Sequence, residues 1–188
     1  MNKSTSLNIA YVYGYQKALN TYHSIVGTLF DKISNINGTF NLRKVQPSDN
    51  SMVRGLIQRL IIKKGGIGLD NLYYDPELID IYESYDRPGS TFEVLTYHNE
   101  VIGTIGLRPG SSSIKSCELQ KLYVDSEFGT QGHERELIQL ALSRATDMGY
   151  VQCFIEIDYQ EVALEQILLD EGFEQVESRG KRRLVYKF

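Results

Sequence analysis

Residues 118–137 read ELQKLYVDSEFGTQGHEREL, and this stretch decides the fold. Its first seven residues have the composition of a half-buried strand, the middle forms a glycine-containing turn, and the last residues begin an amphipathic helix. The first backbone N–H groups of a helix have no partners within the helix, and the helix dipole adds partial positive charge there. We therefore expect the turn from Gly129 to Glu134 to suit an anion such as phosphate, although Glu134 places a carboxylate in it.

The residues after this stretch predict a helix and a second strand. Residues 137–148 carry apolar side chains at helical spacing, Gly149 is placed to end the helix, and residues 153–157 form an apolar strand pattern. A strand, a helix and a strand in so short a span imply a right-handed crossover. The strands at 118–124 and 153–157 are therefore expected to be parallel.

The remaining elements surround this unit. An antiparallel hairpin is expected from strands 92–96 and 101–107, which turn near Asn99. Helical spacing and end signals predict three further helices, and apolar patterns predict two short strands; the helices are 47–63, 75–82 and 161–171, and the strands are 40–43 and 184–188. The fold class is therefore α/β, with a mostly antiparallel mixed sheet that contains a central parallel pair and is flanked by helices.

Two local features refine this picture. Simple alternation along the strand 118–124 puts Leu122 and Val124 on the face of Glu118 and Gln120. The segment 65–74 is rich in glycine and carries two adjacent tyrosines, a composition typical of loops that line ligands.

The N-terminal region predicts a long helix. Apolar residues recur there in 3-4-3-4 spacing on one helix stripe, and the segment SNINGT at 34–39 then ends the pattern; the stripe consists of Val12, Tyr15, Leu19, Tyr22, Val26, Leu29 and Ile33. The stripe either packs back on its own domain or pairs with a second copy in a homodimer. We treat residues 1–38 as an N-terminal helical extension.

Composition excludes several classes of function. The 188 residues suffice for one domain, and 41% hydrophobic residues can supply its core. A net charge of −4 gives no support for binding nucleic acid, and no apolar run is long enough to span a membrane, so we expect a cytoplasmic protein. Cys117 and Cys153 each lie at the start of a predicted strand, where a small buried side chain is the expected role, and no metal-binding pattern is present.

The order of elements, with ELQKLYV leading into the turn and EGFEQV near the end, resembles the GNAT superfamily of acyl-CoA N-acyltransferases over roughly residues 40–188. The resemblance implies a GNAT-like acyltransferase domain at 39–188. It also implies that acetyl-CoA, or another acyl-CoA, is the co-substrate and that a small-molecule or peptide amine attacks its thioester directly.

The resemblance assigns cofactor contacts to the opening stretch. The family pattern Arg/Gln-x-x-Gly-x-Gly/Ala, whose amides hold the coenzyme A pyrophosphate, aligns with Gly129, Gly132 and Glu134, so only the middle position is retained. The segment LYV at 122–124 resembles the segment whose backbone pairs with pantetheine. The implied cofactor-binding residues are Leu122, Tyr123, Val124, Gly129, Thr130, Gln131, Gly132, His133, Glu134 and Arg135.

Glu134 has two possible placements. If its carboxylate points inward, repulsion from a phosphate at about 4 Å costs roughly 4 kcal/mol per charge pair at an effective dielectric near 20. If it points to solvent, or pairs with His133 or Arg135, it only stabilises the first turn of the helix. His133 itself is expected to partner a phosphate or a carboxylate.

The resemblance also assigns catalytic roles. Glu118 aligns with the strand glutamate that acts as general base in the histone-modifying branch of the family; the alternative is a structural glutamate that pairs with Lys121 or caps a neighbour. The family's usual asparagine and tyrosine, which hold substrate or protonate the leaving thiolate, align with Glu161 and Leu168. Tyr159 is the candidate replacement acid, and Tyr123 is also near in sequence.

Two functions therefore remain open. The first is an acetyl-CoA-dependent N-acetyltransferase with Glu118 as base. The second is a catalytically silent GNAT-like domain that binds a ligand or a protein partner, which explains Glu134 and Leu168 together.

Overall fold

The computed structural model describes residues 40–65, 75–110, 115–128, 132–176 and 180–188. The predicted N-terminal helix and the glycine-rich loop from residue 66 onward lie outside these residues, as do Gly129, Thr130 and Gln131.

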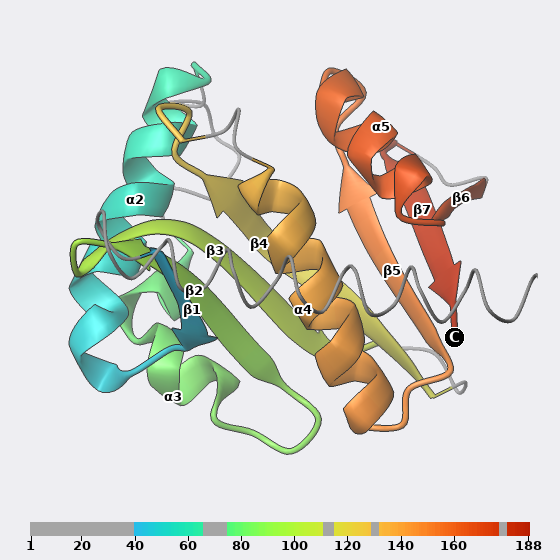
Figure 1. Cartoon of the computed structure of the whole chain (residues 1–188), viewed down its shortest axis with the longest axis horizontal. Helices are drawn as coiled ribbons and strands as arrows, with labels where there is room; N and C mark the ends of the chain where they lie inside the picture. Colours follow the sequence, from blue (N-terminus) through green and yellow to red (C-terminus); the bar gives the residue numbers. More distant parts are fainter. Residues whose placement is uncertain (1–39, 66–74, 111–114, 129–131, 177–179) are drawn as a thin grey trace, which may run out of the picture. The chain divides into compact units, whose positions relative to one another are not determined.

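Within these described residues, seven strands form one sheet in the order β1-β2-β3-β4-β5-β7-β6 (Figure 1). Their bounds are β1 Phe40–Lys44, β2 Thr91–Tyr97, β3 Glu100–Pro109, β4 Ser116–Val124, β5 Gln152–Ile157, β6 Glu174–Val176 and β7 Arg182–Lys187. β4 and β5 are parallel, whereas the pairs β2/β3, β3/β4, β5/β7 and β6/β7 are antiparallel. The expected mixed sheet is thus confirmed. β6 was not predicted, because its three residues are all exposed and carry no alternating pattern.

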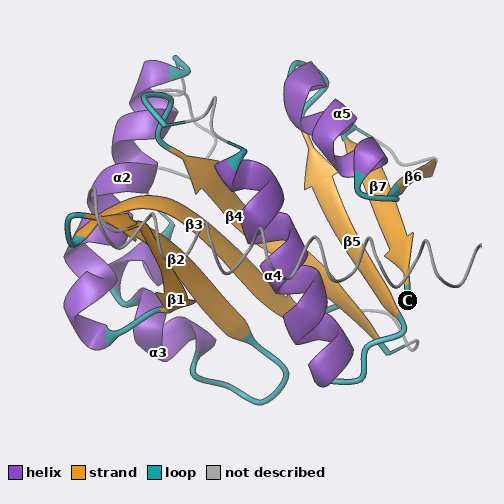
Figure 2. Cartoon of the chain, viewed as in Figure 1, coloured by secondary structure: helices purple, strands orange, loops and turns teal. Residues whose placement is uncertain are grey.

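The helices flank this sheet (Figure 2). Their bounds are α2 Asn50–Lys63, α3 Ile81–Tyr85, α4 His133–Asp147 and α5 Val162–Asp170, with short 3-10 helices η1 Pro47–Asp49 and η2 Pro76–Ile79. The single helix predicted for 75–82 is wrong, since η2 and α3 are separate. The side chain of Asp80 accepts a hydrogen bond from the backbone N–H of Glu83 at 3.0 Å, so a new helix begins there.

Two glycines of β3 show which helices cover which face. A Cβ at Gly103 would lie 3.1 Å from Leu137 of α4, whereas a Cβ at Gly106 would lie 2.7 Å from the Tyr85 hydroxyl of α3. Residues three apart on a strand point to opposite faces. α4 therefore covers one face, and α3 covers the other together with the core face of α2, which comprises Val53, Leu56, Ile57, Leu60 and Ile61.

β4 and β5 are joined along only part of their lengths. Ser116–Leu119 pairs with Gln152–Ile155, and the described residues of β4 beyond Leu119 make no ladder pair with β5. Figure 1 shows the two strands diverging toward their carboxyl ends. Within the paired part, Cys117 lies opposite Cys153, and both are buried as predicted.

Candidate functional site

A β-bulge at Lys121 sets the orientation of every candidate side chain on β4. Gln120 pairs with Gly106 and Tyr123 with Thr104, so Lys121 and Leu122 together oppose one residue of β3. Lys121 has a φ of 51°, in the left-handed region, and its carbonyl accepts a hydrogen bond from Thr104 Oγ1 at 2.8 Å.

The bulge corrects the simple alternation. Gly106 and Thr104 share a face of β3, so their partners Gln120 and Tyr123 share a face too, and Glu118, opposite Arg108, joins them. Leu122 and Val124 therefore lie on the α4 side, not on the side of Glu118. The α3 side of the sheet instead presents a carboxylate, an amide and a phenol in a row.

Glu118 has the environment of a base that is partly withdrawn from water. Burial raises the pKa of its carboxyl group and the neighbouring Glu156 raises it further, while a hydrogen bond from the Gln120 side chain and the charges of Arg183 and Arg108 lower it, with a net upward shift. Among the described residues no cation forms an ion pair with Glu118, so the alternative pairing with Lys121 is not observed. A half-buried carboxylate with a raised pKa can accept a proton from an ammonium group.

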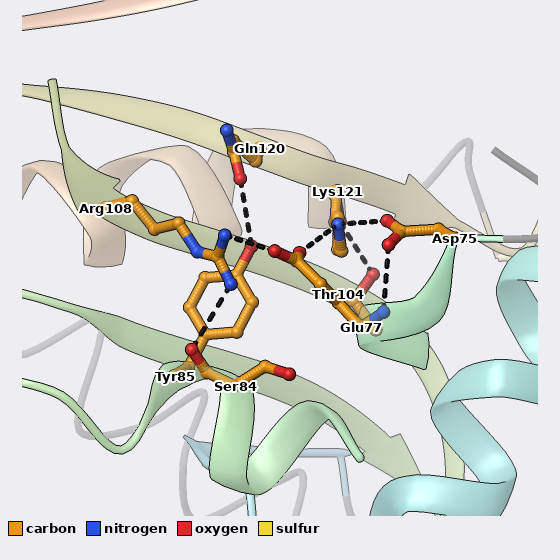
Figure 3. A network of polar contacts seen from close by, with 8 residues as sticks. All are labelled: Asp75, Glu77, Ser84, Tyr85, Thr104, Arg108, Gln120 and Lys121. Atoms are coloured by element: carbon orange, nitrogen blue, oxygen red, sulfur yellow. Dashed lines mark hydrogen bonds and ion pairs between the residues drawn. The ribbon is translucent and has the colours of Figure 1, made fainter. Parts of the chain in front are cut away.

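Lys121 and Arg108 are instead neutralised by two other carboxylates (Figure 3). Lys121 Nζ lies 2.6 Å from Asp75 Oδ2 and 2.9 Å from Glu77 Oε2, and Arg108 pairs with Glu77. These ion pairs fix the entry to α3 against β3 and β4. They also leave Glu118 as a carboxylate available to a cation.

A second carboxylate lies beside Glu118. Phe154 of β5 pairs with Glu118, and Glu156 follows two residues later on the same face. Arg183 of β7 binds Glu156 Oε1 through Nε at 2.9 Å and Nη2 at 2.5 Å, and its guanidinium lies 4.6 Å from the centroid of the Phe154 ring. Glu156 is thus paired, yet it still contributes negative charge next to Glu118.

The two candidate acids, Tyr159 and Tyr123, differ in exposure and in position. Tyr159 is 54% exposed, and its ring lies 5.3 Å from the Arg182 guanidinium. Tyr123 is partly buried on the face of Glu118; burial, together with the carboxylates Glu161, Asp75 and Asp158, raises the pKa of its hydroxyl to about 12. Tyr123 therefore keeps its proton at neutral pH.

The positions of the family's asparagine and tyrosine have structural roles here. Leu168 is a fully buried residue of α5 and contributes to the core. Glu161 precedes α5, and its Oε1 lies 2.8 Å from Lys64 Nζ, at the end of α2. Neither side chain reproduces the chemistry that the family has at these positions.

The beginning of α4 is the candidate pyrophosphate site. Gly132 has a φ of 82°, and α4 begins at His133. Glu134 is partly buried, and its side chain makes no hydrogen bond or ion pair with the described residues. It therefore does not pair with His133 or Arg135, which was one of the two ways in which it was expected to avoid a phosphate; the other was to point to solvent.

The two neighbours of Glu134 have other partners. His133 is 5% exposed, and its Nδ1 lies 2.9 Å from Glu136 Oε2, so it partners a carboxylate in its own helix. Arg135 Nη1 lies 2.7 Å from Glu171 Oε1, which ties α4 to the end of α5. Arg135 is thus engaged away from the turn that would hold a phosphate.

The carboxyl-terminal part of β4 offers an open backbone edge. Leu122, Tyr123 and Val124 pair with β3 on one side, and toward β5 they have no ladder partner among the described residues. An extended group with amide functions, such as pantetheine, can occupy such an edge as a strand would. This edge and the beginning of α4 therefore fit acetyl-CoA, with Glu134 as the discordant residue.

Sequence reasoning missed the residues around Glu118 that come from other elements. Alternation within β5 could have shown that Glu156 lies on the other face of the sheet from the buried Ile155 and Ile157. No local pattern identifies Tyr85 or Arg183, because their position beside β4 depends on long-range strand pairing and helix packing.

Two classes of feature are absent from the described part of the chain. No helix there is long and apolar enough to cross a membrane. The same residues contain no cluster of three or more histidine, cysteine or acidic side chains that could hold a metal ion.

Comparison with known proteins identifies one family. The sequence model of the Acetyltransferase (GNAT) family matches residues 66–175. The uncharacterized N-acetyltransferase YjgM of Escherichia coli is 30% identical over 142 residues, which cover 72% of this chain and 83% of that protein.

Solved structures agree on the fold. The PaiA N-acetyltransferase of Thermoplasma acidophilum, in complex with coenzyme A, superimposes with a TM-score of 0.67 at 17% identity, over 80% of this chain and 99% of that one. A GNAT-family acetyltransferase of Staphylococcus aureus gives a TM-score of 0.70 at 16% identity, over 79% and 99% of the two chains.

Proposed function

The chain belongs to the GNAT family of acetyltransferases, and from this premise we propose that it transfers the acetyl group of acetyl-CoA to an amine by direct attack, with Glu118 as general base. The observation that carries the proposal is the row of Glu118, Gln120 and Tyr123 on one face of β4, beside a backbone edge that β5 leaves open.

Glu118 accepts a proton from the substrate ammonium and so frees the nitrogen lone pair. The amine then forms the new C–N bond at the thioester carbonyl, and the C–S bond breaks. Tyr123 donates its proton to the departing sulfur and regains one from the acetylated nitrogen through solvent. Burial supports both roles, because it raises the pKa of the Glu118 carboxyl group and keeps the Tyr123 hydroxyl protonated.

The acyl-CoA is expected to lie along the open edge of Leu122–Val124, with its pyrophosphate at the amides that begin α4. Among the described residues, Gly132 supports this placement: its φ is positive, and a Cβ there would meet nothing within 4 Å. Glu134 opposes it through its negative charge. The acceptor is expected to be a cationic amine, because Glu118 and Glu156 lie together on that face.

A catalytically silent domain is the second candidate. Two observations favour it: the partly buried Glu134 carboxylate has no partner among the described residues, and a core leucine, Leu168, stands where the family has a tyrosine. A silent domain of this kind would bind a ligand or protein without acyl transfer.

Isothermal titration calorimetry with acetyl-CoA, followed by a thiol-release assay on a panel of amines, separates the two functions. The enzyme hypothesis predicts binding and turnover with at least one amine. Absence of heat at millimolar acetyl-CoA would exclude it, whereas binding with no released thiol across the panel would favour the silent domain.

The variant Glu134→Gln tests the electrostatic argument. Removing this charge is expected to tighten acetyl-CoA binding about tenfold, equivalent to roughly 1.4 kcal/mol. Glu174→Gln is the control, because it makes the same charge change at an exposed residue of β6. Equal affinities of wild type and Glu134→Gln would show that the Glu134 carboxylate points away from the phosphates.

A further inference from the structure

Gln120 links Glu118 to a residue of α3 that is far away in the sequence. Gln120 lies two residues from Glu118 on the same face of β4, and a hydrogen bond from its side-chain amide lowers the pKa of the Glu118 carboxyl group. Gln120 Oε1 accepts a hydrogen bond from the Tyr85 hydroxyl at 3.1 Å (Figure 3). An amide has distinct donor and acceptor ends, so a fixed donor at Oε1 turns the NH₂ group toward Glu118. The orientation of Gln120 is therefore set by Tyr85.

Tyr85 is held rigidly enough to serve as that fixed donor. It is 1% exposed, its ring packs edge-on against Phe92 with centroids 4.9 Å apart, and the Arg108 guanidinium lies 4.2 Å from its centroid. Gly106 provides the space, because a Cβ there would come within 2.7 Å of the hydroxyl oxygen. Burial raises the pKa of the Tyr85 hydroxyl, so it remains a donor at neutral pH.

Arg108 of the neighbouring strand β3 also acts on Glu118. It lies opposite Glu118 in the β3/β4 register, but its hydrogen bonds go to Glu77 and to the Ser84 carbonyl at 3.2 Å. Its charge acts on Glu118 through space without forming an ion pair. Arg108 thus lowers the pKa of the Glu118 carboxyl group without pairing with it, and the carboxylate remains available for a substrate.

We infer that Gln120 and Tyr85 form a positioning relay, in which the buried hydroxyl orients the amide and the amide aims the Glu118 carboxylate and favours its ionised form. This inference rests on the proposed function for its role in catalysis, whereas the hydrogen-bond relay itself can be tested without turnover. Neither residue contacts the reacting atoms, so both are positioning residues.

The direct test is a ¹³C NMR titration of the Glu118 side-chain carboxyl group in the ligand-free protein. Gln120→Leu removes the donor and is expected to raise the pKa of Glu118 further. Tyr85→Phe keeps the ring and its packing but releases the amide, and is expected to raise the pKa by a smaller amount. Tyr82→Phe is the matched control in the same helix and is expected to leave the pKa unchanged, because the structure gives its hydroxyl no partner among the described residues.

The kinetic readout is the pH profile of kcat/KM with acetyl-CoA and the best amine of the panel. Gln120→Leu is expected to lower kcat/KM about tenfold near pH 6 and to approach wild type near pH 9, because a base with a raised pKa regains its ionised form at high pH. An evenly reduced rate at every pH, with an unchanged Glu118 titration, would overturn the relay. A shifted titration in a protein without turnover would support the relay and reject the enzyme.

Discussion

Glu118, the proposed general base, carries a cost in stability. Its pKa is raised mainly by burial, so the folded state favours the protonated form more than the unfolded state does. A group with a raised pKa stabilises the fold fully below its unfolded pKa, and this contribution is lost as the pH rises through the folded pKa. At neutral pH the ionised carboxylate therefore destabilises the folded protein.

The variant Glu118→Gln is expected to unfold at a higher temperature than wild type at pH 7, because glutamine stays neutral. The difference is expected to vanish below about pH 4, where the wild-type carboxyl group is protonated in both states. Turnover is expected to fall by about a hundredfold to ten-thousandfold. Thermal melts across pH and the thiol-release assay check the two effects. Equal melting temperatures of wild type and variant at every pH, together with undiminished turnover, would show that Glu118 neither destabilises the fold nor acts as the base.

Tyr123 and Tyr159 can be distinguished by the same substitution. Tyr123→Phe is expected to lower kcat about a hundredfold through loss of the proton donor, whereas Tyr159→Phe is expected to stay within about threefold of wild type. The reason is location, since Tyr123 shares the face of Glu118 and Tyr159 is largely exposed. Steady-state kinetics with one amine would show the reverse pattern if Tyr159 were the acid.

At the scale of elements, the contact between β3 and α3 depends on the absence of a Cβ at Gly106. Gly106→Ala would place a Cβ 2.7 Å from the Tyr85 hydroxyl oxygen and 2.8 Å from two ring carbons, in a strand with a neighbour on each side. We expect the variant to lose about 1–3 kcal/mol of unfolding free energy through overpacking, measured by urea denaturation.

Gly55→Ala is the control for this substitution. Gly55 is an exposed residue within α2, and a Cβ there would meet nothing within 4 Å. Alanine is expected to stabilise the helix by about 0.5–1 kcal/mol, because it restricts the unfolded chain more than glycine does. If both variants shifted stability equally, the Tyr85 contact would not be the cause.

Elements with a clear period were predictable, and elements that depend on their partners were not. The apolar spacing of α2 and α4 and the strand, helix, strand order were sufficient for the mixed sheet and the parallel pair. The bulge at Lys121 was not predictable, because lysine carries no signal for a positive φ. Its consequence was that alternation assigned Leu122 and Val124 to the wrong face.

The candidate site was only partly accessible from the sequence for the same reason. Glu118 could be proposed from one strand, since its position there is local. Gln120 is only two residues away in the sequence and could also be noticed. The buried hydroxyl that fixes its amide belongs to Tyr85, and this contact cannot be predicted without knowing the fold. The partners of His133 and Arg135 were likewise matters of packing at the start of α4.

At the scale of the whole sheet, the strands β1 to β4 and the strands β5 to β7 meet along four ladder pairs, Ser116–Leu119 with Gln152–Ile155. Acetyl-CoA along the open edge of β4 is expected to connect the two sets of strands. At one hundred times its dissociation constant it should stabilise the folded state by about 2.7 kcal/mol, or a rise of roughly 5–10 °C in melting temperature. Differential scanning calorimetry with and without acetyl-CoA checks this, and an unchanged melting temperature at saturating concentration would contradict binding to the folded state.

The extra residue in β4 decides which side chains share the face of Glu118. Lys121 and Leu122 together oppose Ile105, so deleting the codon for Lys121 would restore regular alternation with Leu122 still opposite Ile105 and Tyr123 still opposite Thr104. The phenol of Tyr123 would therefore stay on the side of Glu118. A straight strand of unchanged length would instead put this phenol under α4 and Leu122 beside Glu118, so substitutions at Lys121 that disfavour a positive φ offer a route by which evolution or an engineer can exchange the two sides.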